Sequence, residues 1–153
     1  YTGGSLTAYA VVEIARPASG QQARRPIWGA GVSKSRVKLG RRGEELAAEK
    51  LCQRGYTIVS RNWRCLLGEV DLVTRRAEAW TFFEVRTRRG RAYGTPEESV
   101  TDEKLERMVS VAQMYLAEHE INAHDVDWQV GFVAVEMDRA GRLMRIDIYE
   151  NLY

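Results

Sequence analysis

Two short acidic segments near the middle of the chain constrain its fold more than any other feature. Residues 68–71 read GEVD and residues 83–86 read FEVR, and each segment lies within a run of apolar, β-branched and aromatic residues. Such runs are typical of strands. Side chains two residues apart on a strand share a face, so Glu69 and Asp71 point to the same side of the predicted sheet.

The register between these two strands decides where the acids meet. Residues 76–79 have the pattern of a short turn, which predicts an antiparallel hairpin. With an even and symmetric loop, Asp71 lies opposite Glu84. Glu69 then lies opposite Arg86. Opposite residues have Cβ atoms about 5 Å apart, so one divalent cation could bridge Asp71 and Glu84, whereas a slip of one residue would separate the acids.

Carboxylates gathered on one sheet surface repel one another unless a cation or a proton offsets their charge. Mg²⁺ or Mn²⁺ suits such a site, because hard cations take oxygen ligands and few protein carboxylates. The arrangement favours metal-assisted hydrolysis of phosphodiester bonds. The alternative is that Glu69, Asp71 and Glu84 are ordinary solvent-facing residues of a half-exposed sheet, although acids are depleted in strands.

The remaining pattern predicts a mixed α/β fold. We expect helices over residues 41–54 and 101–118, and further strands over residues 56–63, 128–136 and 143–149. The resulting order, α, β, β, β, α, β, β, is typical of a small mixed sheet with helices packed on it. Thr101 is the expected N-cap of the second helix. Trp63 and Trp80 are interpreted as core residues.

Charge and composition limit the domain organisation. Residues 1–42 hold eight Lys or Arg and one Glu, a net of +7, whereas residues 101–153 hold five basic and eleven acidic residues, a net of −6. A basic amino-terminal third indicates either a polyanion partner or a solubilising arm. We predict a basic arm or linker over residues 1–39 and one domain over residues 40–153.

Other classes of protein are disfavoured by the sequence. Cys52 and Cys65 form no CxxC motif, which favours two reduced thiols in a cytoplasmic protein over a disulfide or a metal site. No apolar run approaches the roughly 20 residues of a membrane span, and residues 1–15 lack the pattern of a secretory signal. His119 and His124 lack the spacing of metal ligands or of a catalytic triad.

Five short motifs follow one another along most of the chain. In chain order they are Gly40-x-x-Gly43-Glu44, Arg61-Asn62-Trp63-Arg64, Gly68-Glu69-Val70-Asp71, Phe83-Glu84-Val85-Arg86 and Lys104. Together they resemble the YraN family of bacterial proteins. That family belongs with the PD-(D/E)xK, restriction-endonuclease-like nucleases and is similar to archaeal Holliday junction resolvases. The resemblance covers residues 37–149.

The resemblance implies a fold and a set of roles. It implies a restriction-endonuclease-like αβββαβ core with a mixed central sheet flanked by helices. It places Asp71 and Glu84 as metal ligands and the main-chain carbonyl of Val85 as a third. Glu44 would help from the first helix, directly or through a water. Without the resemblance, Glu44 is equally a favourable charge at a helix N-terminus. Glu69 would be an auxiliary acid.

One position departs from the family pattern. The family usually has lysine where this chain has Arg86. Arginine stays protonated in proteins, so it is a poor general base, but it can orient a water and clamp a phosphate. Lys104 has two interpretations: a surface lysine, or an amine supplied to the site from the second helix.

Arginines elsewhere are candidates for contacts with the phosphates of a nucleic acid. Residues 86–94 are expected to form a basic loop, which is either simply solvated or grips the backbone. The candidate nucleic-acid-binding residues are Arg41, Arg42, Arg88, Arg89 and Arg91.

Three functional hypotheses remain open at this point. The first is a Mg²⁺-dependent or Mn²⁺-dependent endonuclease acting on DNA, including branched or flapped DNA. The second is a non-catalytic nucleic-acid-binding module that keeps the nuclease fold, for which Arg86 is the argument. The third is an accessory subunit that acts with a partner enzyme. Similarity to Holliday junction resolvases also implies a homodimer, by analogy.

Overall fold

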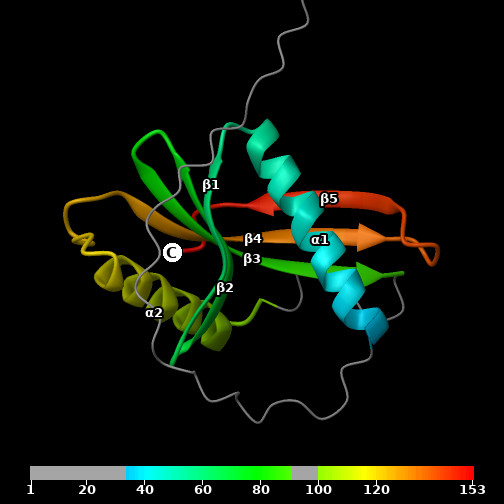
Figure 1. The fold of residues 1–153 in the computed structure, drawn as a ribbon, viewed down its shortest axis with the longest axis horizontal. Helices are drawn as coiled ribbons and strands as arrows, with labels where there is room; N and C mark the ends of the chain where they lie inside the picture. Colours follow the sequence, from blue (N-terminus) through cyan, green and yellow to red (C-terminus); the bar gives the residue numbers. More distant parts are fainter. Residues whose placement is uncertain (1–33, 91–99) are drawn as a thin grey trace, which may run out of the picture. The chain divides into compact units, whose positions relative to one another are not determined.

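The computed structural model describes residues 34–90 and 100–153 of the chain. The chain divides into two units between Gly31 and Val32, and all described residues belong to the second. Its elements, in chain order, are α1 (Lys34–Gln53), β1 (Thr57–Cys65), β2 (Gly68–Arg76), β3 (Ala79–Arg89), α2 (Asp102–Glu118), β4 (Trp128–Met137) and β5 (Leu143–Tyr149) (Figure 1). The predicted order of helices and strands is confirmed.

The five strands form one sheet in the order β1-β2-β3-β4-β5. All neighbours are antiparallel except β3 and β4, which run parallel and are joined through α2. Alternation along the strands builds two cores. Leu72 and Phe83 pack with α1, whereas Val73 and Phe82 pack with α2 on the opposite face. The fold is therefore mixed α/β, with one helix on each face of the sheet, consistent with a restriction-endonuclease-like core.

Helix α1 begins at Lys34, earlier than the start predicted at Arg41. The prediction treated Gly40 as the boundary. A glycine inside a helix costs only about 1 kcal/mol relative to alanine, and packing offsets this cost because the partly buried Leu39 contacts the core. The helix ends as predicted near Gly55, whose φ of 84° suits glycine.

Strand β3 extends to Arg89, so the prediction of a basic loop starting at Arg86 was wrong for the described residues. Residues 86–89 pair in parallel with residues 134–137 of β4. The hydrogen bonds of this ladder outweigh the weak strand preference of a run of arginines. The remainder of the predicted loop, including Arg91, lies outside the described residues.

Helix α2 confirms the predicted cap and core stripe. The Thr101 hydroxyl accepts a hydrogen bond from the Lys104 N–H at 3.3 Å, which satisfies a donor of the first turn. Tyr115 is buried and meets Trp63 edge to face, with ring centroids 5.1 Å apart. Trp80 is also buried, so the interpretation of both tryptophans as core residues is confirmed.

Two further expectations concern thiols and membranes. Cys52 and Cys65 are both free thiols, as predicted. Across residues 34–90 and 100–153, neither helix combines the length and the apolar character needed to cross a bilayer.

Gly43 allows α1 to lie directly against β3. A Cβ atom at this position would collide with the side chain of Thr87, whereas a Cβ atom at Gly40 would meet nothing within 4 Å. We predict that Gly43→Ala lowers the free energy of unfolding by about 1–3 kcal/mol through overpacking. Gly40→Ala, the matched control, should raise it by roughly 0.5–1 kcal/mol. Urea denaturation measures both, and equal effects would mean that the Thr87 contact does not set the helix position.

Candidate metal centre

Strand β2 leaves β3 at Asp71. The β2–β3 ladder runs from the two-residue turn to Leu72 opposite Phe83, and its continuation would place Val70 opposite Val85. The β2–β3 ladder ends at the Leu72–Phe83 pair, although β2 stays paired with β1 on its other side as far as Gly68. The Val85 N–H donates to the Asp71 carboxylate, with an N···Oδ2 distance of 2.7 Å. Asp71 thus replaces a main-chain acceptor where the two strands separate.

The same separation exposes an oxygen of the main chain. The N–H and the carbonyl of one strand residue point to the same neighbouring strand. The Val85 N–H points toward Asp71, so the Val85 carbonyl also faces β2. The β2–β3 ladder has ended at this point, so Val70 is not paired with Val85. This geometry agrees with the ligand role that the family resemblance implies for Val85.

Asp71 lies in an environment that disfavours its charge. Burial is the main cause, and the neighbouring carboxylate of Glu84 adds to it, with smaller contributions from Glu44 and Glu69. Together they raise the pKa of Asp71 to about 7, although the hydrogen bond from the Val85 N–H acts in the opposite direction. The predicted grouping of acids around Asp71 is therefore present.

Glu84 is held by two cationic side chains. Its Oε1 atom is 2.8 Å from Lys104 Nζ and 2.9 Å from an Nη atom of Arg86. Lys104 is only 7% exposed, so its interpretation as a surface lysine was wrong. Burial lowers the pKa of Lys104, and the hydrogen bond to Glu84 opposes that change. Helix α2 thereby places an amine beside the acid of β3.

Asn62 is a residue whose role the sequence did not reveal. Its Nδ2 atom donates to Glu44 Oε2 at 3.1 Å, which ties the carboxylate of α1 to β1. Asn62 has a φ of 51°, a left-handed conformation that asparagine tolerates better than most residues. The RNWR motif contained the signal, since an asparagine within a strand suggests an irregular backbone. Asn62 positions Glu44 toward the Asp71 side of the site.

Glu69 does not lie opposite Arg86, so this part of the predicted register was wrong. Glu69 pairs with Arg64 of β1 on the other side of β2, and the Arg64 Nε to Glu69 Oε2 distance is 2.9 Å. The reason is the divergence of β2 from β3, which begins two residues beyond Glu69. Glu69 still lines a narrow crevice with Glu84 and Met108.

The arrangement fits a hard divalent cation. Within the described residues, no group of three or more Asp, Glu, His or Cys side chains is placed to hold a metal ion. The candidate set is therefore two carboxylates, Asp71 and Glu84, with the carbonyl of Val85. Mg²⁺ suits it, because this ion keeps several waters and binds proteins through one or two carboxylates. Positive charge here would also relieve the repulsion that raises the pKa of Asp71.

Four of the predicted phosphate-contacting arginines lie in described elements. The close approach of Gly43 to Thr87 brings the α1 segment that carries Arg41 and Arg42 against the end of β3, which carries the other two. Arg41 and Arg42 are exposed, and an Nη atom of Arg42 is 3.3 Å from Glu45.

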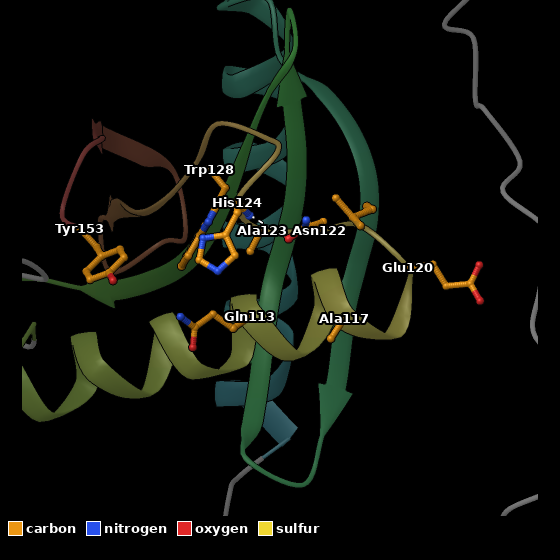
Figure 2. Close-up of a pocket in the computed structure, with 9 residues that line it drawn as sticks. Gln113, Ala117, Glu120, Asn122, Ala123, His124, Trp128 and Tyr153 are labelled. Carbon is orange, nitrogen blue, oxygen red and sulfur yellow. Dashed lines mark hydrogen bonds between the residues drawn. The ribbon is translucent and has the colours of Figure 1, made fainter.

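A separate open pocket of about 920 Å³ lies toward the other end of α2. Trp128 and Tyr153 form one side of it, with ring centroids 5.4 Å apart, and Gln113 and His124 lie beside them (Figure 2). Glu120 extends away from this group (Figure 2). The pocket lacks paired carboxylates, since Glu120 is the one acidic side chain among the described residues that line it. The acids of β2 and β3 therefore remain the candidate centre.

Comparison with known proteins identifies the family. The model of "Uncharacterised protein family UPF0102" matches residues 43–149. A UPF0102 protein of Acidothermus cellulolyticus is 44% identical over 117 residues, which covers 76% of this chain and 89% of the relative. UPF0102 proteins of Pelotomaculum thermopropionicum and Roseiflexus castenholzii are each 41% identical, over 78% and 67% of this chain and 98% and 82% of the relatives. The chain therefore belongs to the UPF0102 family, which is the YraN family.

Proposed function

We propose that this protein is a metal-dependent endonuclease that hydrolyses phosphodiester bonds of DNA, including branched or flapped DNA. The observation that carries the proposal is the convergence of Asp71, Glu84 and Lys104 where β2 separates from β3. Two acids and an amine where two central strands separate suit phosphodiester hydrolysis better than a purely structural role, because burial and the neighbouring acids raise the pKa of Asp71.

Asp71, Glu84 and the Val85 carbonyl would hold Mg²⁺ or Mn²⁺. When bound, the cation supplies positive charge to the phosphate and acidifies a water molecule. Glu44 and Glu69 add negative charge around this position, which increases the attraction for a cation. Asn62 keeps the Glu44 carboxylate oriented.

Lys104 and Arg86 act on the water and on the phosphate. Burial lowers the pKa of Lys104, which makes it easier for Nζ to give up its proton, and a deprotonated Nζ can orient the attacking water and accept a proton from it. The water oxygen forms a bond to phosphorus as the opposite phosphorus–oxygen bond of the DNA backbone breaks, and the leaving oxygen takes a proton from a solvent water. Arg86 stays protonated and stabilises the negative charge that develops on the phosphate oxygens. Lys104 thus takes the task for which Arg86 is chemically unsuited.

The arginines at the start of α1 and at the end of β3 would grip the DNA backbone. Arg41 and Arg42 lie on α1 beside the strand end that carries Arg88 and Arg89. Phosphate contacts of this kind make affinity fall steeply as salt rises. The free thiols Cys52 and Cys65 suit a reducing compartment such as the cytoplasm, where nucleic acids are available polyanions.

Calorimetric titration with Mn²⁺ and a cleavage assay on linear, flapped and four-way DNA test the proposal. We expect wild-type protein to bind the ion and cut DNA, and Glu84→Gln to lose both. Gln preserves the shape of the side chain but removes the charge. Glu78→Gln is the matched control, because Glu78 is an acid on the turn of the same hairpin with a side chain that is 94% exposed. It should behave as wild type.

Several results would contradict the proposal. Equal ion binding by Glu84→Gln and wild type would remove Glu84 from the site. Ion binding without cleavage of any DNA, together with retained DNA binding, would favour the non-catalytic module. Cleavage that appears only after another protein is added would favour the accessory subunit.

A further inference from the structure

The turn between β1 and β2 presents an apolar tip close to the candidate metal centre. Leu66 is fully exposed and Leu67 is 47% exposed, and both lie between the end of β1 and the start of β2. Leaving such side chains in water forgoes about 25 cal/mol for each Å² of apolar surface that could be buried. Two adjacent leucines at a hairpin tip are therefore a candidate contact surface.

Guanidinium groups flank this tip. Arg64 contacts Glu69 through Nε, and its side chain is still 72% exposed. Arg107 of α2 is exposed and lies over the turn, since a Cβ atom on Gly68 would be 3.7 Å from Arg107 Cδ. Arginines that bind phosphates beside an apolar residue that contacts bases are a combination suited to DNA. A symmetric contact between two copies of the tip would instead bring like charges together.

We propose that Leu66 and Leu67 insert between bases where stacking is already interrupted, so that the protein recognises branched, flapped or nicked DNA. The proposal rests on the proposed nuclease function and specifies its substrate class. Unstacking a continuous duplex costs a few kcal/mol per step, and the cost is least where the base is already unpaired or unstacked. The same insertion therefore discriminates between interrupted and continuous duplexes.

The position of the tip also predicts where the cut falls. Leu67 immediately precedes β2 and Asp71 is the fourth residue of that strand, a separation of at most about 13 Å along an extended chain. DNA rises about 3.4 Å per nucleotide along one strand. The cut should therefore lie within about five nucleotides of the disrupted step, rather than at a random distance from it.

A binding assay without metal tests the inference independently of cleavage. The probes are a flapped duplex with 2-aminopurine at the branch point and a continuous duplex of the same sequence. We expect wild-type protein to bind the flap at least about 10-fold more tightly, a difference of about 1.4 kcal/mol, and to raise the fluorescence of 2-aminopurine. The double variant Leu66→Ser, Leu67→Ser should lose this preference and the fluorescence change, yet bind the continuous duplex as wild type does. Met144→Ser is the matched control, because Met144 is a 68% exposed apolar residue on β5.

The outcomes separate this inference from the nuclease proposal. Unchanged preference and fluorescence in the double variant would overturn the insertion, as would absence of DNA binding by the wild type. A dimer in sedimentation that dissociates only in the double variant, with unchanged fluorescence, would assign the tip to a second copy of the chain. Wild-type protein that prefers flapped DNA but cuts none with Mg²⁺ or Mn²⁺ would support the insertion and overturn the nuclease.

Discussion

Asp71→Asn should make the metal-free protein more stable at pH 8 while abolishing its binding of Mg²⁺ and its cleavage of DNA. The asparagine side chain keeps an oxygen that can accept the hydrogen bond from the Val85 N–H. It removes a buried charge that Glu84, Glu44 and Glu69 repel. Loss of the cation should reduce cleavage at least about 10³-fold, since metal-ion catalysis supplies several kcal/mol.

The stability change has a defined dependence on pH. The pKa of Asp71 is about 7 in the folded protein, against an ordinary value of 3.8. Between these values the folded state retains a proton that the unfolded state has lost. The stabilising contribution is therefore complete below about pH 4 and is lost as pH rises through 7, a total on the order of 4 kcal/mol. Asp71→Asn should remove this part of the pH dependence.

Urea denaturation of metal-free wild type, Asp71→Asn and Glu78→Gln between pH 4 and pH 8 measures the effect. Glu78 is the exposed acid on the same hairpin, and its substitution should leave the curve as in wild type. Added Mn²⁺ should stabilise wild type at pH 8, by about 2.7 kcal/mol at 100 times its dissociation constant, and should leave Asp71→Asn unaffected. A variant less stable than wild type at pH 8 would show that the Asp71 charge is compensated within the protein itself.

The β2–β3 hairpin was predictable from the sequence because residues close together in the chain specify it. Alternation of apolar residues defined both strands, and residues 76–79 defined the turn, so the register from Leu72 opposite Phe83 followed. The point where β2 leaves β3 was not predictable, because the local strand pattern continues beyond Leu72 and Phe83, where the ladder ends. Beyond that point Glu69 contacts Arg64 of β1, on the other side of β2, and has no partner in the β2–β3 ladder.

The burial of Lys104 could have been predicted from its position in the sequence. It lies four residues before Met108, on the stripe that continues through Ala112 and Tyr115 into the core. A lysine on a core stripe is buried only if its charge finds a partner. The sequence could place Lys104 on that face, but only the folded sheet shows that Glu84 is the partner.

Lys104→Gln should lower kcat by about 10²–10⁴-fold with little change in KM, if the amine accepts the proton of the attacking water. Arg86→Lys should retain activity, because the Lys104 amine already lies 2.8 Å from Glu84 Oε1 and the new lysine keeps the positive charge of Arg86. These two substitutions discriminate between the two cations that contact the same carboxylate oxygen.

Lys104→Arg separates the transfer of a proton from the neutralisation of charge. Arginine preserves the positive charge beside Glu84 but does not release its proton, so it should be as inactive as glutamine. In wild type the rate should rise with pH up to a plateau, with an apparent pKa below the ordinary lysine value of 10.5. Full activity in Lys104→Arg would reduce Lys104 to a partner that holds Glu84. Loss of activity in Arg86→Lys alone would assign the essential cation to Arg86 of β3 and leave Lys104 of α2 as the partner of Glu84.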